Sequence, residues 1–72
     1  MRKKNKIKII VNGKQMTVNI KYSLKNLMDK LKLPIKKIAI ELNRQIVDKK
    51  RMSKIILKSG DKIEIVNFIG GG

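Results

Sequence analysis

Three glycines at the C-terminus, Gly70-Gly71-Gly72, are the residues of this chain that are best suited to chemistry. Glycine has no Cβ and is costly to order, so such a run contributes little to packing. It makes a thin, flexible tail that can enter a narrow channel and present a carboxylate there. That terminal carboxylate is the one reactive group of the tail, and it is held away from the fold. The alternative interpretation is a frayed terminus, the commonest fate of last residues.

The other side chains do not indicate an enzyme. The sequence contains no histidine and no cysteine, which excludes disulfides and the usual zinc sites. Its five acidic residues are scattered without the paired spacing of a general acid and base. We expect a protein without catalytic residues, metal ligands or a bound cofactor.

Length and hydropathy indicate one small, soluble domain. A chain of 72 residues is near the lower end of what folds without help. No apolar run is long enough to span a bilayer, and the basic start is not followed by a signal-peptide stretch. We expect a cytoplasmic protein with a disordered basic tail at residues 1–5, a domain at 6–68 and a flexible tail at 69–72.

The net charge of +14 raises the question of an anionic partner such as nucleic acid. Three arginines and two aromatic residues are few for base-edge readout or for stacking on single strands. The basic residues are also spread along the whole chain. We expect salt-sensitive, non-specific binding and no specific nucleic-acid partner.

The first half of the domain predicts a hairpin and a helix. Residues 6–11 alternate with period two, Asn12-Gly13 is a strong hairpin signal, and residues 14–20 form the returning strand. Ser23 is a candidate N-cap, and Pro34 is expected to stop the helix. The residues expected to pack between these elements are Ile7, Ile9, Val11, Met16, Val18, Ile20, Leu24, Leu27, Met28 and Leu31.

The second half predicts a second hairpin and a last strand. Residues 38–42 alternate, Asn43-Arg44 can turn the chain, and residues 45–47 can return along it. Residues 48–51 are interpreted as a solvated charged loop. The next segment is expected to tuck back onto the core through Met52, Ile55, Ile56 and Leu57. A turn at residues 59–61 then leads into a strand over residues 62–68.

The order ββαβββ fits an α+β fold in which one main helix lies across a mixed sheet of four to five strands. This pattern resembles the β-grasp, or ubiquitin-like, architecture. The resemblance, rather than the periodicity, places the last strand at the centre of the sheet and parallel to the first.

Several segments resemble the sulfur carrier proteins of thiamine biosynthesis, in the ThiS/MoaD ubiquitin-like superfamily. The similar segments are Ala-Ile-Glu-Leu-Asn-Arg-Gln-Ile-Val at residues 39–47, Gly-Asp-Lys-Ile-Glu-Ile at residues 60–65, and the Gly-Gly end. The first two favour this family over its molybdopterin-synthase relative, and the Gly-Gly end is common to both.

The resemblance implies a carrier that other proteins act upon. The resemblance makes Gly72 the modified residue, with Gly70 and Gly71 as its slender approach. A ThiF/MoeB-like adenylating enzyme, using ATP and magnesium, would activate the Gly72 carboxylate, because a carboxylate is a poor electrophile until it is activated and glycine leaves its carbonyl sterically open. A sulfur donor fed by a cysteine desulfurase would convert it to a thiocarboxylate, and thiazole synthase (ThiG) would take the sulfur. Two alternatives remain open: a sulfur carrier for molybdopterin or another pathway, and a ubiquitin-like modifier that is conjugated to lysine.

Strand parity predicts a partner face on the side of the sheet away from the helix. Ile10, Val66 and Phe68 are expected there as an apolar patch beside the tail, with Ile69 continuing it. A contiguous exposed apolar patch is a mark of an interaction site. The alternative interpretations are that these side chains turn inward, or that they are scattered exposure without consequence.

Overall fold

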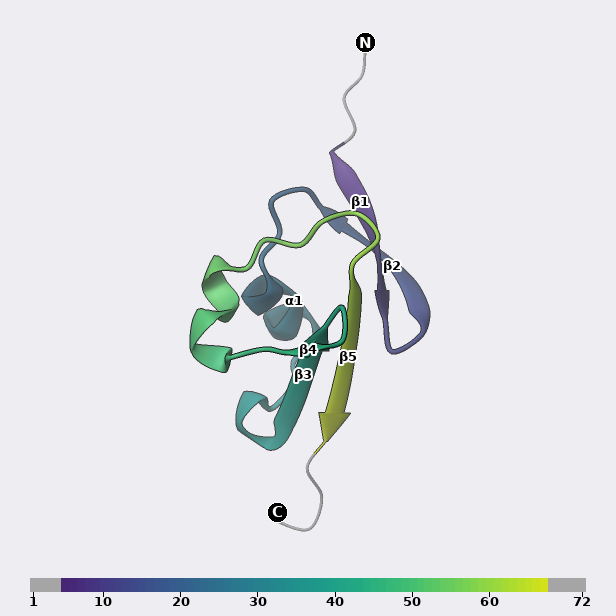
Figure 1. Cartoon of the computed structure of the whole chain (residues 1–72). Helices are drawn as coiled ribbons and strands as arrows, with labels where there is room; N and C mark the ends of the chain where they lie inside the picture. Colours follow the sequence, from purple (N-terminus) through teal and green to yellow (C-terminus); the bar gives the residue numbers. More distant parts are fainter. Residues whose placement is uncertain (1–4, 68–72) are drawn as a thin grey trace.

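The computed structural model describes residues 5–67, in which one helix lies against one face of a five-stranded sheet (Figure 1). Residues 1–4 and 68–72 lie outside this range, and with them all but one residue of the tail expected at 1–5 and the whole of the tail expected at 69–72. The elements are β1 Lys6–Val11, β2 Lys14–Asn19, α1 Leu24–Leu31, η1 Ile35–Lys37, β3 Ile38–Leu42, β4 Gln45–Ile46, η2 Lys49–Lys54 and β5 Lys62–Asn67, where η marks a 3₁₀ helix.

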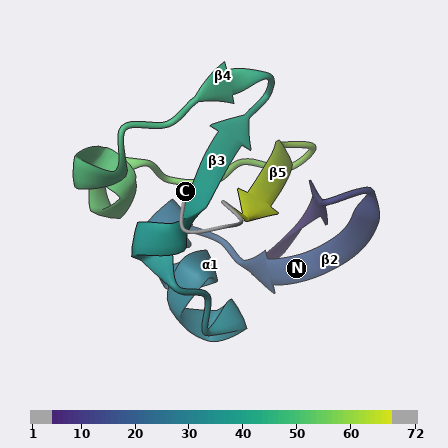
Figure 2. The ribbon, with the colours of Figure 1, turned by 90° about the horizontal axis from the view of Figure 1, so that it is seen from below.

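The strand order is β2-β1-β5-β3-β4, so the last strand of the chain lies in the middle of the sheet. β5 runs parallel to β1 and antiparallel to β3. In Figure 2 it lies between β3 and the β1–β2 hairpin, with α1 on one side of the sheet. The predicted β-grasp architecture, including the central parallel strand, is confirmed.

The first hairpin has the predicted register. Ile9 pairs with Met16, and Asn12 and Gly13 turn the chain with φ values of 49° and 83°. The prediction for Ile20 is wrong, because β2 ends at Asn19 and the Ile20 side chain is 41% exposed. The Ile20 N–H still donates to the Asn5 carbonyl at 3.0 Å, and the chain turns immediately afterwards at Lys21, whose φ is 64°.

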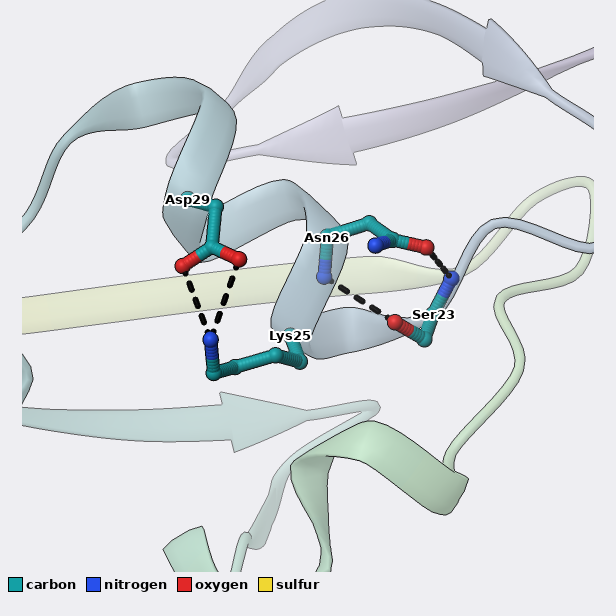
Figure 3. Close-up of polar contacts among 4 residues, drawn as sticks. All are labelled: Ser23, Lys25, Asn26 and Asp29. Atoms are coloured by element: carbon teal, nitrogen blue, oxygen red, sulfur yellow. Dashed lines mark hydrogen bonds and ion pairs between the residues drawn. The ribbon is translucent and has the colours of Figure 1, made fainter.

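Helix α1 begins at a reciprocal capping box (Figure 3). The Ser23 hydroxyl accepts from the Asn26 N–H at 3.0 Å, and the Asn26 side-chain oxygen accepts from the Ser23 N–H at 3.0 Å. Two N–H groups that the first turn would otherwise leave unpaired are thereby satisfied. The helix then buries Leu24, Leu27 and Met28 against the sheet, as the helical spacing predicts.

The helix ends earlier than proline requires. Lys32 adopts the left-handed region at φ 55°, and its N–H donates to the carbonyl of Asp29. The Leu33 N–H reaches the Met28 carbonyl at 3.3 Å, which completes a Schellman-type end. The expectation that Pro34 stops the helix is therefore corrected: the left-handed cap stops it, and Pro34 precedes η1.

The segment after β4 is more ordered than predicted. The expected charged loop is the start of η2, and the Asp48 carboxylate accepts from the Lys50 N–H at 3.0 Å as its cap. Met52 and Leu57 are both 3% exposed, whereas Ile56 is 47% exposed. Residues 55–57 run extended beside the start of α1, so their side chains alternate and the inward prediction for Ile56 is wrong.

A single apolar core joins the sheet, α1 and η2. Its fully enclosed side chains come from the inner face of the sheet and the facing side of the helix. These residues are Ile9, Leu24, Leu27, Met28, Ile38, Ile40 and Ile63. Because β5 contributes Ile63 to this core from the central position, the strand that leads to the glycines is anchored in the domain.

Candidate functional site

Strand β5 is the element that must position the predicted tail, because Gly70 to Gly72 follow it in the sequence. On one side it pairs with β3 over the whole range from Leu42↔Ile63 to Ile38↔Asn67. On the other side, β1 pairs with it only at Ile10↔Lys62 and Val11↔Ile63. The last part of β5 is therefore supported by β3, with little help from β1.

Asn12, at the tip of the first hairpin, extends the support on the β1 side. Its N–H donates to the Ile63 carbonyl at 2.9 Å, and its side-chain oxygen accepts from the Ile65 N–H at 2.7 Å. The side chain thus takes the place of a backbone acceptor where the β1 strand has already turned away. One residue both forms the turn and holds β5.

Asn43, in the second turn, holds the beginning of β5 from the opposite side. Its N–H donates to the Lys62 carbonyl at 2.8 Å, and its side-chain oxygen accepts from the Lys62 N–H at 2.9 Å. Its amide group also donates to Asp61 at 3.0 Å, and the second Asp61 oxygen accepts from the Lys58 N–H at 2.7 Å. The turn that launches β5 is fixed by side chains as well as by backbone.

The sequence interpretation identified both asparagines only as turn residues. Their contacts to β5 span 53 and 19 positions in the chain, and no local pattern reveals a partner so distant. The available signal is that both hairpin turns begin with asparagine, a residue that tolerates positive φ and carries an acceptor.

Two residues of the predicted partner face lie within the described range, on the side of the sheet away from α1. Val66 is 57% exposed and stands beside Ala39 of β3, whereas Ile10 is half-buried and stands beside Lys62. Lys62 and Val66 are four positions apart, about 13 Å along a strand. The expected continuity of Ile10 with Val66 is therefore corrected: parallel pairing places Ile10 toward the start of β5, away from the tail.

Phe68, Ile69, Gly70, Gly71 and Gly72 lie outside the described residues. Their assignment as partner-binding and modified residues stays a prediction. What the structure adds is the strand end from which they continue, where Asn67 pairs with Ile38.

A hollow of about 400 Å³ lies beside this end of β5, and the sequence interpretation did not foresee it. It is formed where the first hairpin, the end of α1 and the end of β5 meet. Its lining residues are Val11, Asn12, Lys14, Leu31, Leu33, Ile65 and Asn67. Apolar side chains from three elements therefore remain partly accessible next to the base of the tail.

Within residues 5–67, no group of three His, Cys, Asp or Glu side chains could hold a metal ion. In the same part of the chain, no helix has the length and apolar character needed to cross a membrane.

Comparison with known proteins gives a family match over residues 6–72, to the ThiS family. The chain is 35% identical over 66 residues to a thiazole synthase of Paramagnetospirillum magneticum, which covers 92% of this chain and 20% of that protein. A thiazole synthase of Magnetococcus marinus is 33% identical with the same coverage. The chain thus spans about a fifth of the length of these two relatives.

Two further similarities are to small proteins. The sulfur carrier protein ThiS of Bacillus subtilis is 36% identical over 50 residues, which covers 69% of this chain and 76% of that protein. The crystal structure of a thiamine biosynthesis protein (ThiS) from Geobacter metallireducens matches with a TM-score of 0.77 and 29% identity. That match covers 92% of this chain and 100% of the other.

Proposed function

The chain belongs to the ThiS family, and on this premise we propose that it is a sulfur carrier protein of thiamine biosynthesis. The observation that carries the proposal is the family match through residue 72, which includes the strand β5 and the three glycines. The chain acts in this proposal as the substrate of other proteins and holds no cofactor.

The proposed chemistry takes place at the Gly72 carboxylate. A carboxylate oxygen attacks the α-phosphorus of ATP on a magnesium-dependent adenylating enzyme, and pyrophosphate leaves. A persulfide sulfur supplied by a cysteine desulfurase then displaces AMP, and a thiol reduces the resulting acyl disulfide to a thiocarboxylate. Thiazole synthase takes the sulfur of the thiocarboxylate into the thiazole ring, and an oxygen replaces it at Gly72, which returns to a carboxylate.

The arrangement of β5 supports this role. The strand is anchored at the centre of the sheet and held by two asparagine side chains, so its end has a fixed direction relative to the domain. Five residues follow Asn67 and can span at most about 17 Å. A partner that works on Gly72 must therefore contact the surface around the end of β5 while the tail occupies its active site.

The first test is the intact mass of the protein produced in a cell that retains its natural activator, desulfurase and synthase. We expect a mass increase that corresponds to exchange of one oxygen for sulfur, localised to Gly72 and absent after deletion of Gly72. Adducts that join Gly72 to lysines of other proteins would contradict the carrier proposal and favour a conjugated modifier.

Because thiocarboxylates hydrolyse, adenylation is measured separately with the purified activating enzyme. The wild-type chain should support exchange of labelled pyrophosphate into ATP, and deletion of Gly71 and Gly72 should abolish it. The exposed substitution Lys8→Ala is a matched control that leaves the tail intact and should retain the exchange. Equal exchange with and without the two glycines would contradict the proposal.

A further inference from the structure

Among residues 5–67, no strand pairs with the end of β5 on its β1 side. On the β3 side, the N–H and the carbonyl of Lys62 both form hydrogen bonds with Asn43. On the β1 side, the Ile63 carbonyl and the Ile65 N–H form hydrogen bonds with Asn12. Backbone groups alternate between the two sides of a strand, so the backbone groups of Asn67 also point toward the β1 side.

The pairing with β1 ends at Val11↔Ile63. Beyond it, the Asn12 side chain accepts a hydrogen bond from the Ile65 N–H. Figure 1 shows β5 continuing past the turn of the β1–β2 hairpin on this side. Within residues 5–67, the Ile65 carbonyl and the Asn67 N–H therefore face an edge without a neighbouring strand. Unpaired groups of this kind are a template for pairing with another chain.

The hollow beside β5 lies along the same edge, since Ile65 and Asn67 both line it. Its apolar surface comes from four half-buried side chains, Val11, Leu31, Leu33 and Ile65. Lys14 lines it as an exposed residue, and none of the described residues that line it is acidic. The edge thus combines one acceptor, one donor, an apolar recess and a positive charge.

We propose that this edge accepts an extended segment of thiazole synthase, which adds a strand beside β5 and carries an apolar and an acidic side chain. The Ile65 carbonyl and the Asn67 N–H supply the backbone hydrogen bonds of strand addition. The hollow accepts one of the side chains that alternate along the added strand. The acidic side chain of the segment pairs with Lys14. The net charge of +14 adds to the attraction between this chain and an acidic segment.

This inference rests on the proposed function for the choice of partner. In the two thiazole synthase relatives, the segment that matches this chain is part of the same polypeptide as the synthase. A contact between that segment and the rest of the synthase is intramolecular in those proteins, which raises the effective concentration of the two surfaces. The edge lies directly before the tail, so a strand added at Asn67 would hold the carrier while Gly72 enters the active site.

The decisive variant is Asn67→Pro in the full chain, because proline removes the edge-facing N–H and leaves the hydrogen bonds to β3 in place. Asn67→Ala is the matched control, since it changes the same side chain and retains the N–H. Titration calorimetry against purified thiazole synthase should show affinity about tenfold weaker for the proline variant. The alanine variant should stay within about twofold of wild type, and thermal unfolding verifies that both are folded.

The charge is tested with Lys14→Glu against Lys8→Glu, which changes the net charge equally at an exposed position outside the hollow. We expect Lys14→Glu to weaken binding to thiazole synthase several-fold and Lys8→Glu to leave it unchanged. Hydrogen exchange gives a direct readout of the Asn67 amide, which has no hydrogen-bond partner among residues 5–67. This amide should exchange at least about tenfold more slowly in the complex, as a new hydrogen bond requires.

Unchanged binding of both Asn67→Pro and Lys14→Glu would overturn the inference, as would an unprotected Asn67 amide or the absence of binding by the wild-type chain. If Asn67→Pro weakened binding to the adenylating enzyme and left binding to thiazole synthase unchanged, the choice of partner would be overturned. Failure of the carrier proposal is distinct, because it is read from the mass of Gly72 and from pyrophosphate exchange rather than from binding at the edge.

Discussion

Asparagine at the first position of both hairpin turns performs two tasks in this protein. Asn12 and Asn43 have φ values of 49° and 51°, a conformation that asparagine adopts more readily than most residues. Each side chain then accepts a hydrogen bond from a backbone N–H of β5. The turn and the placement of the central strand therefore depend on the same two residues.

At the residue scale, we predict that Asn12→Gly lowers the free energy of unfolding by about 1 kcal/mol. Glycine keeps the positive φ and removes the acceptor of the Ile65 N–H, so exchange of that amide should accelerate. Asn12→Asp keeps the acceptor and should stay close to wild type. Urea unfolding and amide exchange by NMR measure both effects, and an Ile65 amide that is equally protected in the glycine variant would show that Asn12 serves only the turn.

At the scale of elements, the segment from η2 to residue 57 is a second cover for the core beside α1. It is held to the start of the helix by backbone bonds, from Leu24 N–H to the Ile55 carbonyl and from Leu57 N–H to the Tyr22 carbonyl, both 2.8 Å. Met52 and Leu57 enter the core from this cover. A helix of eight residues is too short to enclose the sheet face alone, and this segment completes the enclosure.

The adjacent residues Leu57 and Ile56 provide a matched test of this role. Leu57→Ala should destabilise the protein by about 2–4 kcal/mol, because it leaves a cavity in the core. Ile56→Ala should cost less than about 1 kcal/mol, since that side chain is 47% exposed. Chemical unfolding of the two variants gives the comparison. Equal losses would mean that the extended segment does not alternate as described.

At the scale of the whole molecule, positive charge is the dominant feature. The chain has 19 basic and 5 acidic residues, and two of the acids, Glu41 and Glu64, stand opposite each other on β3 and β5. The ion pair between Lys25 and Asp29 (Figure 3) is exposed at both ends and contributes little to stability. Repulsion among the basic residues therefore opposes folding of a molecule whose radius of gyration is 12.7 Å.

We predict that the melting temperature rises when sodium chloride is increased from about 0.01 M to about 0.1 M, because the screening length falls from about 30 Å to about 10 Å. The double substitution Lys36→Glu and Lys37→Glu lowers the net charge from +14 to +10, since each change removes one positive charge and adds one negative charge. Both positions are exposed, so this variant should show a smaller rise. A wild-type melting temperature that falls or stays constant over the same range would contradict the prediction.

The sequence by itself determined the elements whose signals are local. Period-two alternation and the Asn12-Gly13 turn are sufficient for the first hairpin, and helical spacing behind Ser23 is sufficient for α1, because these patterns act over a few residues. The Gly-Gly end and the segments at 39–47 and 60–65 were also sufficient to indicate the family. The assignment of Gly72 is likewise a sequence prediction, and it lies outside the described residues.

Only the tertiary structure decided what depends on distant partners. It separated Ile10 from Val66, because a parallel pairing register is set by how strands pack and not by either strand's own pattern. It showed that Ile56 points outward and that η2 contributes Met52 to the core. The sequence pattern could not predict this, because an extended or 3₁₀ segment of a few residues has no distinctive period. It also joined Asn12 to Ile65, since a hydrogen bond between residues 53 positions apart exists only once the sheet has formed. Among residues 5–67, it left Asn67 without a neighbouring strand on the β1 side.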